Sequence, residues 1–251
     1  MQPRETAERA GRILAEVERA VVGKREALEL VLLGILADGH VLLEDFPGLA
    51  KTLLARSFAQ AADAEFTRVQ FTPDLLPADI TGSAIFNQRD NEFEFRPGPI
   101  FTNLLLADEV NRAPPKTQAA LLEAMQEYQV TVGGVRYPLE RPLFVLATEN
   151  PIEQEGTHPL PEAQLDRFML NIVMTYLSED EEVRVVTETT GVDLGEPERV
   201  LSGTDILAFQ RVVRQVLIPE DVARYAVRLV DASRPGRPGT PEFIEKWVKW
   251  G

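Results

Sequence analysis

The sequence contains no cysteine, and only two of its 251 residues are histidine. The absence of cysteine excludes disulfide scaffolds, cysteine nucleophiles and cysteine-based metal sites, and two histidines leave little for a histidine-rich metal centre. Any metal ion that this protein binds is therefore expected to be held by oxygen atoms.

Long apolar segments and an excess of positive charge are also absent. No segment approaches the roughly 18 consecutive apolar residues of a membrane span, and the first residues lack the apolar core of a secretory signal, so we expect a soluble, cytoplasmic protein. The 40 acidic and 26 basic residues give a formal charge of −14. This charge argues against a protein whose main affinity comes from neutralising nucleic-acid phosphates, although it does not exclude a local basic pore.

The apolar residues that are present follow two different spacings. Short continuous apolar runs are typical of buried parallel strands with functional groups at their carboxyl ends. Three such runs occur, at residues 41–43, 104–107 and 143–147. Apolar side chains at helical spacing occupy three other segments, at residues 6–20, 27–36 and 51–62. The sequence therefore predicts an α/β fold with a parallel sheet flanked by helices.

Two inserted hairpins and a second domain complete this plan. Strand-like residues flank turn signals near residues 84–96 and 129–140, which predicts a hairpin in each segment. After Leu177 the strand signals fade, and helical patterns follow an acidic segment. We therefore expect an α/β core at residues 1–176 and a small all-helical domain at residues 177–251.

The segment from Leu43 to Thr52 follows a predicted strand and opens a predicted helix, which is the setting of a phosphate-binding loop. In such a loop the helix N-terminus and successive backbone N–H groups cradle phosphates. Lys51 would reach the β and γ phosphates of ATP, and the Thr52 hydroxyl would bind Mg²⁺. Asp45 and Ala50 replace the two glycines of the strict pattern. Taken alone, the segment fits an ordinary Pro-Gly turn before an amphipathic helix equally well.

Asp108 and Glu109 end another predicted strand and are the acids that a phosphate-binding loop needs. Asp108 would hold the Mg²⁺ shell, and Glu109 would orient and polarise the attacking water. A strand that simply ends in solvated carboxylates is the alternative for this pair alone. The two motifs in this order favour an ATPase that converts ATP to ADP and phosphate with Mg²⁺.

Two more polar side chains extend the candidate site. Asn150 follows the strand at 143–147 and could reach the γ-phosphate and the attacking water, although Asn before Pro is also ordinary turn chemistry. Arg167 ends a short helical stretch and could act as an arginine finger on a neighbour's γ-phosphate, although an Asp-Arg pair on a helix usually lies at the surface. Arg167 carries little weight without the other motifs.

The order of these motifs resembles the MoxR family of AAA+ ATPases over nearly the whole chain. The matching segments are the phosphate loop, Asp108–Ala113, Ala147–Pro151 and Leu160–Phe168. In that family the loop often reads Pro-Gly-x-Ala-Lys-Thr, so Ala50 fits, whereas Asp45 departs from the pattern. The resemblance implies an AAA+ P-loop core with two hairpins on the pore-facing side of a hexameric ring. It also implies nucleotide contacts at Val22 and Gly23 beside the adenine, and at Pro47, Gly48, Leu49, Ala50, Lys51, Thr52 and Leu53.

The function implied by this resemblance is that of an ATP-driven, chaperone-like motor that remodels or matures proteins with von Willebrand factor A domain partners. A nucleic-acid motor of the same clade and a nucleotide-gated scaffold with little turnover are the alternatives. In the family a pair such as Trp250-Gly251 precedes an arginine, the second sensor, and further lid helices. The resemblance therefore implies that the helical lid domain is incomplete in this sequence.

Overall fold

The computed structural model describes residues 2–44, 48–150, 156–189 and 197–249. Residue contacts divide the chain into two compact units, Met1–Arg214 and Gln215–Gly251. The first unit contains every strand that the structure describes. The domain boundary expected after residue 176 lies shortly after the last of these strands and stays a prediction.

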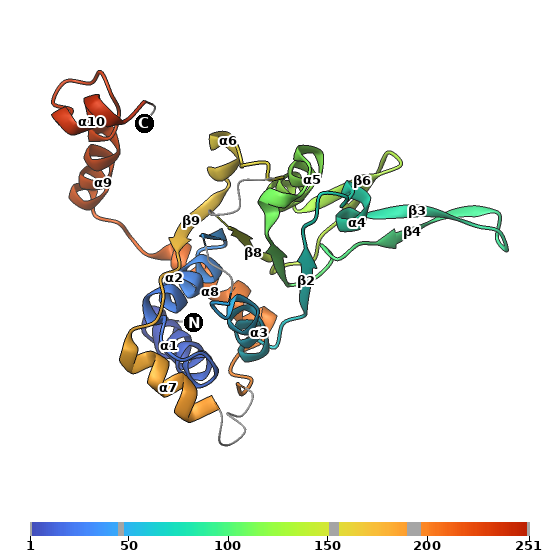
Figure 1. Cartoon of the computed structure of the whole chain (residues 1–251), viewed down its shortest axis with the longest axis horizontal. Helices are drawn as coiled ribbons and strands as arrows, with labels where there is room; N and C mark the ends of the chain where they lie inside the picture. Colours follow the sequence, from blue (N-terminus) through green and yellow to red (C-terminus); the bar gives the residue numbers. More distant parts are fainter. Residues whose placement is uncertain (1, 45–47, 151–155, 190–196, 250–251) are drawn as a thin grey trace. The chain divides into compact units, whose positions relative to one another are not determined.

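A five-stranded parallel sheet forms the centre of the first unit (Figure 1). Its strand order is β2-β5-β8-β1-β9, with β1 (His40–Glu44), β2 (Phe66–Gln70), β5 (Leu104–Asp108), β8 (Phe144–Glu149) and β9 (Phe168–Val173). The three predicted strands are the central ones, because burial on both faces makes their sequences continuously apolar. The two edge strands were not predicted: β2 contains three polar residues, and β9 is apolar except for Asn171. The expected α/β fold class is confirmed.

Successive residues of the central strands point into two separate cores. One core joins Leu43, Leu106 and Leu146 to helices α1 (Pro3–Ala20), α2 (Arg25–Leu36), α3 (Lys51–Ala61) and α8 (Gly203–Gln215). The other joins Leu42, Leu105 and Val145 to α4 (Pro77–Thr81) and α5 (Pro115–Glu127). The alternation follows from the two-residue period of a strand. Helices on both faces thus fix the sheet and hold the carboxyl ends of its strands at one edge.

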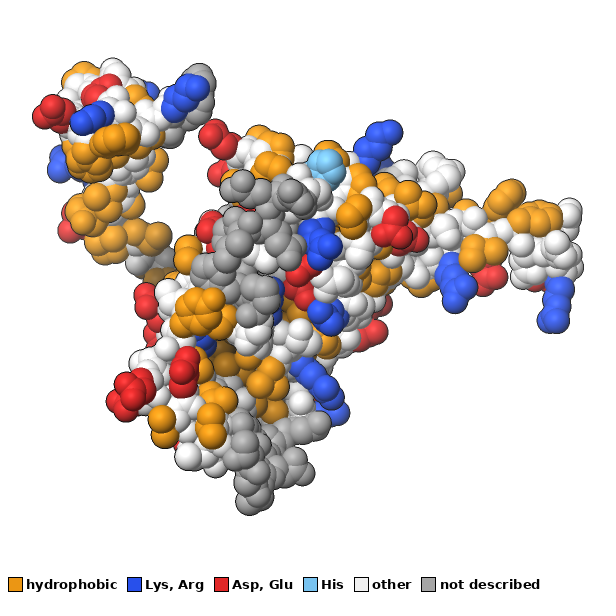
Figure 2. All heavy atoms as spheres, viewed as in Figure 1, with side chains coloured by type: hydrophobic (Ala, Val, Ile, Leu, Met, Phe, Trp, Pro, Cys, Tyr) orange, Lys and Arg blue, Asp and Glu red, His pale blue; other side chains and the backbone are white. Residues whose placement is uncertain are grey.

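Both expected hairpins are present. The first pairs β3 (Gly82–Asn87) with β4 (Glu92–Pro97), and the second pairs β6 (Gln129–Val132) with β7 (Val135–Pro138). Gly82 has a φ of +92°, and a Cβ there would lie 2.3 Å from the Arg96 carbonyl oxygen, so the base of the first hairpin requires glycine. This hairpin extends well beyond the sheet (Figure 1), and apolar side chains lie along its surface (Figure 2).

Five further helical elements are described, three in the first unit and two in the second. The first unit contains the 3₁₀ helix η1 (Val110–Arg112), α6 (Glu162–Leu165) and α7 (Glu179–Thr189). The second unit contains α9 (Glu220–Ala232) and α10 (Glu242–Trp247). Within the described ranges, no helix combines the length and the apolar content that a bilayer crossing needs.

Candidate functional site

The predicted phosphate loop ends in a helix N-terminus that carries no side-chain cap. Gly48 and Ala50 both have left-handed backbones, with φ of +89° and +62°, and α3 begins directly afterwards at Lys51. Ala50 has no side chain that could cap the helix, and the N-terminus of an α-helix carries a partial positive charge that favours an anion. Leu49 packs against the core, whereas Thr52 and Leu53 are exposed in the first turn. Pro47 lies outside the described residues.

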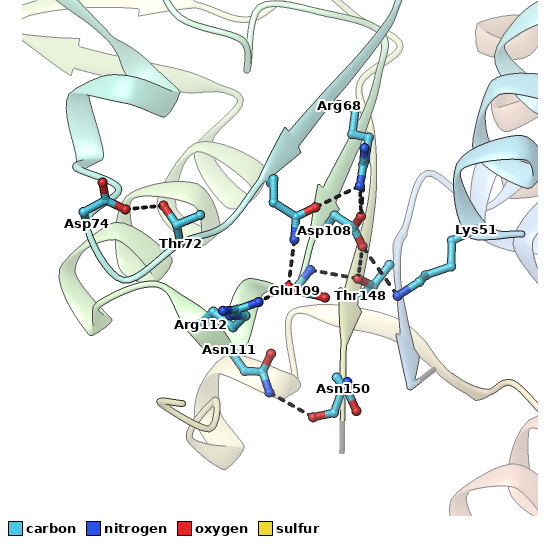
Figure 3. A network of polar contacts seen from close by, with 11 residues as sticks. Lys51, Arg68, Thr72, Asp74, Asp108, Glu109, Asn111, Arg112, Thr148 and Asn150 are labelled. Carbon is cyan, nitrogen blue, oxygen red and sulfur yellow. Dashed lines mark hydrogen bonds and ion pairs between the residues drawn. The ribbon is translucent and has the colours of Figure 1, made fainter. Parts of the chain in front are cut away.

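Lys51 and Asp108 come together at the carboxyl end of the sheet (Figure 3). The Lys51 Nζ atom lies 3.6 Å from Asp108 Oδ1, and the two side chains are only 12% and 7% exposed. Burial of two opposite charges is favourable only when further hydrogen bonds satisfy them. Asp108 has these hydrogen bonds, and they come from two neighbouring strands.

Thr148 on β8 connects the two predicted acids. Its hydroxyl donates to Asp108 Oδ1 at 2.7 Å and accepts from the Glu109 backbone N–H at 2.8 Å. Asp108 Oδ2 accepts from both Nε and Nη2 of Arg68, at 3.2 and 2.7 Å. Burial alone would raise the pKa of Asp108, but the hydrogen bonds from Thr148 and Arg68 and the charge of Lys51 outweigh it, so this pKa lies below its ordinary value.

Glu109 is held by two donors in a backbone conformation that is unusual for glutamate. Its φ of +57° and ψ of +51° are left-handed, a conformation that costs energy for residues other than glycine and often occurs at functional sites. The Glu109 carboxylate accepts from Gln70 Nε2 at 2.7 Å and from Arg112 Nη1 at 2.9 Å. Asp108 and Glu109 thus point to different partners although they are adjacent in sequence (Figure 3).

Asn150 directly follows β8 and is 4% exposed. Asn111, in η1, donates its side-chain N–H to the Asn150 carbonyl oxygen at 3.3 Å. This hydrogen bond ties the segment after β5 to the segment after β8, so Asn150 lies at the same edge of the sheet as Glu109 (Figure 3).

The residues predicted to lie beside an adenine precede α2. Val22 is buried, and Gly23 has a φ of +72°. A Cβ on Gly23 would lie 2.7 Å from Leu177 Cδ2 and 2.9 Å from Glu181 Oε1, so glycine permits α7 to approach this turn closely. The adjoining residues line a cavity of about 480 Å³ at the carboxyl end of β9, formed by Lys24, Leu30, Ile172, Met174, Tyr176 and others.

Among the candidates that the structure describes, Arg167 lies away from this edge of the sheet. It is exposed and precedes β9, whereas Lys51, Asp108 and Glu109 lie at the carboxyl ends of strands. It lines a cavity of about 620 Å³ together with His40 and Tyr128 at the amino end of the sheet. The structure therefore brings the other described candidates to one sheet edge and leaves Arg167 outside that group.

The polar groups at this edge suit a divalent cation that arrives with a ligand. Among the described residues, no cluster of three or more His, Asp and Glu side chains could hold a metal ion alone. Asp108 supplies a buried carboxylate and Thr52 an exposed hydroxyl at a helix N-terminus. Mg²⁺ is usually bound by one or two such oxygens together with waters and substrate phosphates. The donor set therefore fits Mg²⁺ carried by a phosphorylated substrate.

Five residues of this network were not predicted as site residues from the sequence: Arg68, Gln70, Asn111, Arg112 and Thr148. Arg68 and Gln70 occupy alternate positions of β2, and their side chains point to the same neighbouring strand end. An i, i+2 pair of polar residues beside a predicted site is the signal that could have identified them. Recognition of this signal requires β2 to be assigned as the neighbour of β5.

Comparisons with known proteins agree on one family. Residues 40–170 match the model of the ATPase family associated with various cellular activities (AAA). The chain is 48% identical over 227 residues to the uncharacterized protein YeaC of Bacillus subtilis, covering 89% of this chain and 70% of that protein. It is 44% identical over 240 residues to Chaperone MoxR1 of Mycobacterium tuberculosis, covering 96% of this chain and 63% of that protein.

A crystal structure from Cytophaga hutchinsonii, of a protein assigned as an ATPase, superposes with a TM-score of 0.82 at 45% identity. The match covers 92% of this chain and 71% of that chain. At this identity the likeness extends from the fold to the family.

Proposed function

Because this chain belongs to the MoxR family of AAA+ ATPases, we propose that it binds and hydrolyses ATP at the carboxyl end of its sheet and remodels partner proteins. The observation that carries the proposal is the buried contact of Lys51 with Asp108 beside the uncapped N-terminus of α3. A cation, a carboxylate and a helix N-terminus are the parts that a triphosphate with Mg²⁺ requires.

The proposed reaction is attack of water on the γ-phosphorus of ATP, with ADP and phosphate as products. Bound Mg²⁺ would neutralise charge on the β and γ phosphates, with Thr52 and Asp108 as its protein partners. Lys51 would leave its contact with Asp108 and turn its charge toward the phosphates. Glu109 would accept a hydrogen bond from the attacking water and align it, and Asn150 would hold the same water from the end of β8.

Arg167 requires a second subunit in this proposal. It lies at the amino end of the sheet, so it would serve the γ-phosphate of a neighbouring copy in a ring, as an arginine finger does. A hexamer is the assembly we propose, with von Willebrand factor A domain proteins as partners.

A protein rather than a nucleic acid is the proposed target of the ring. The chain has a formal charge of −14, which opposes binding to phosphates. The projecting β3–β4 hairpin exposes Phe86 and Phe93, whose rings lie 5.3 Å apart, and its strands carry Glu92 and Glu94. Exposed aromatic side chains beside acids suit polypeptide contacts better than the backbone of DNA.

The central test is the pair Glu109→Gln and Glu123→Gln. Loss of a group that aligns and activates water typically lowers the rate about 10²- to 10⁴-fold. We expect Glu109→Gln to retain ATP affinity and lose turnover by such a factor, measured as phosphate release and as ATP binding. Glu123 is exposed on α5, so Glu123→Gln is the matched control and should keep both. Equal turnover in Glu109→Gln and the unmodified protein would contradict the role of Glu109.

The shared-site proposal is tested by mixing two inactive variants. Arg167→Ala keeps its own phosphate site, and Lys51→Ala keeps its own finger. Mixed rings should therefore regain part of the ATPase activity that each variant lacks alone. No recovery in mixtures that sedimentation shows to be co-assembled would contradict a finger that acts across subunits.

A further inference from the structure

Arg68 lies on the edge strand β2, beside the strand that carries Asp108 and Glu109. Parallel pairing sets Arg68 opposite Leu106 and Gln70 opposite Asp108. The Arg68 guanidinium donates twice to Asp108 Oδ2, at 3.2 Å from Nε and 2.7 Å from Nη2. The other oxygen, Oδ1, accepts from Thr148 and faces Lys51. Asp108 is therefore fixed from two sides, and Arg68 supplies the whole of one side.

The same guanidinium also orients Gln70. Nη2 of Arg68 donates to Gln70 Oε1 at 2.8 Å, and the amide Nε2 of Gln70 donates to Glu109 at 2.7 Å. Because the amide oxygen is engaged by Arg68, the amide nitrogen must face Glu109. One arginine thus acts on one acid directly and on the next acid through a glutamine.

We propose that Arg68 is a positioning residue for the proposed ATPase, an inference that rests on the function proposed above. It holds the Asp108 carboxylate in one rotamer, ready for Mg²⁺, and it sets the direction of the Gln70 amide. Its Nε and Nη2 atoms are engaged by Asp108 and Gln70, so its role is distinct from that of Lys51. Second partners of this kind typically change metal affinity or activity about 10- to 100-fold when they are removed.

Arginine is suited to this position by geometry as well as charge. The planar guanidinium presents donors in a fixed fork, so Nε and Nη2 can meet one carboxylate oxygen while Nη2 also reaches an amide. Lysine has one nitrogen on a flexible stem and loses the fixed fork. Arg68→Lys should therefore retain part of the positioning effect of Arg68, whereas Arg68→Ala should retain none.

The test measures how much Mg²⁺ strengthens binding of the slowly hydrolysed analogue ATPγS. Calorimetry gives the Kd with Mg²⁺ and the Kd with EDTA, and their ratio is the Mg²⁺ enhancement. We expect Arg68→Ala to keep the EDTA value within about twofold and to lower the enhancement about 10-fold or more. Arg68→Lys should fall between Arg68→Ala and the unmodified protein.

Two control variants separate the contact of Arg68 with Asp108 from its contact with Gln70. Arg199→Ala removes a guanidinium that is 73% exposed and pairs with Asp63, and it should leave the enhancement unchanged. Gln70→Met keeps the Arg68–Asp108 contact, so it should also keep the enhancement. A loss in Gln70→Met as large as that in Arg68→Ala would show that Arg68 does not act through Asp108.

The outcomes distinguish this inference from the proposed function. An unchanged enhancement in folded Arg68→Ala, or in Arg68→Lys and Arg68→Gln if the alanine variant does not fold, would overturn the inference alone. An EDTA affinity that falls as far as in Lys51→Ala would make Arg68 a direct nucleotide contact and would also overturn it. An unmodified protein that binds no ATPγS under either condition would overturn both proposals.

Discussion

The two ends of the central sheet each contain a buried polar cluster, but the clusters are satisfied in different ways. At the carboxyl end, Asp108 and Glu109 are bound mainly by other side chains, from Arg68, Gln70 and Thr148. At the amino end, His40 is bound by backbone groups. The Val145 N–H donates to His40 Nδ1 at 3.1 Å, and His40 Nε2 lies 3.4 Å from the Met125 carbonyl oxygen.

This difference separates a cluster that can exchange partners from one that cannot. A side chain such as Lys51 can rotate toward a ligand, whereas the Val145 N–H cannot leave its strand without breaking the sheet. The amino-end cluster is closed further by Arg141, which pairs with Asp38 and lies 4.1 Å from the centre of the Tyr128 ring. We therefore expect substitutions of Lys51, Asp108 and Glu109 to change activity, and substitutions of His40 and the groups packed around it to change stability.

The largest effect is expected for His40→Ala. His40 is 6% exposed, and its loss would leave the buried Val145 N–H without an acceptor, which costs about 1–3 kcal/mol. The cavity left by the imidazole adds to that cost. The free energy of unfolding, measured with urea, should therefore fall by roughly 2–5 kcal/mol.

His40→Asn is the matched variant, because the asparagine Oδ1 can take the place of Nδ1 as acceptor for the Val145 N–H. It should regain part of the lost stability. ATP affinity should be unchanged in His40→Asn when it is measured well below the unfolding transition. If His40→Asn lowered the ATP affinity without lowering stability, the expected difference between the two ends of the sheet would be contradicted.

The second prediction is the opposite result for Lys51→Ala. Charged hydrogen bonds contribute about 1.5–3 kcal/mol, so loss of Lys51 should weaken ATP binding about 10- to 150-fold. Asp108 keeps Thr148 and Arg68 as partners, so the melting temperature without nucleotide should change little. Calorimetric titration and thermal unfolding of the same sample measure both effects. A large drop in melting temperature would show that the Lys51–Asp108 contact is structural.

The features of the two sheet ends that depend on local sequence patterns could be predicted from the sequence. The three central strands were predicted because apolar runs mark strands buried on both faces, and Lys51, Asp108 and Glu109 follow them at the expected places. The edge strand β2 was missed because residues 66–70 are mostly polar, with Phe66 and Val69 as their apolar members, and contain no continuous apolar run. Arg68 and Gln70 were missed with it. His40 could not be recognised as a sheet-end acceptor, because its partner Val145 is 105 residues away.

The third prediction uses pH to separate the two ends. Burial is the main reason that the pKa of His40 is lowered, together with the charge of Arg141, against the opposing effects of the Met125 carbonyl and Asp38. The unfolded chain therefore takes up a proton on His40 more readily than the folded chain. Stability from this residue is fully present above the unfolded pKa of about 6.5 and is lost as pH falls below it.

The pKa of Asp108 is also lowered, but here hydrogen bonds and the charge of Lys51 stabilise the charged form, whereas burial of His40 disfavours its charged form. Asp108 therefore contributes to stability over a different pH range. Its stability is present above the unfolded pKa of about 3.9 and is lost as pH falls further. Urea unfolding between pH 7.5 and 5 should thus report His40, with a slope of at most about 1.4 kcal/mol per pH unit. This slope should be smaller in His40→Asn. An equal slope in both proteins would assign it to another group.

The smallest predicted effect concerns backbone strain, which occurs at both ends of the sheet. Ala50 has a φ of +62° and Asp38 a φ of +61°, although neither is glycine. For an L-residue this conformation costs about 1–2 kcal/mol, and glycine removes that cost while adding flexibility to the unfolded chain. Ala50 makes no cap hydrogen bond, so Ala50→Gly should stabilise the protein by up to about 1 kcal/mol and leave ATP turnover intact. Asp38→Gly relieves the same strain but removes the carboxylate that pairs with Arg141, so it should destabilise the protein. Urea unfolding of the two variants measures whether each substitution raises or lowers the free energy of unfolding. A stabilising Asp38→Gly would mean that the amino-end cluster contributes less to folding than its contacts indicate.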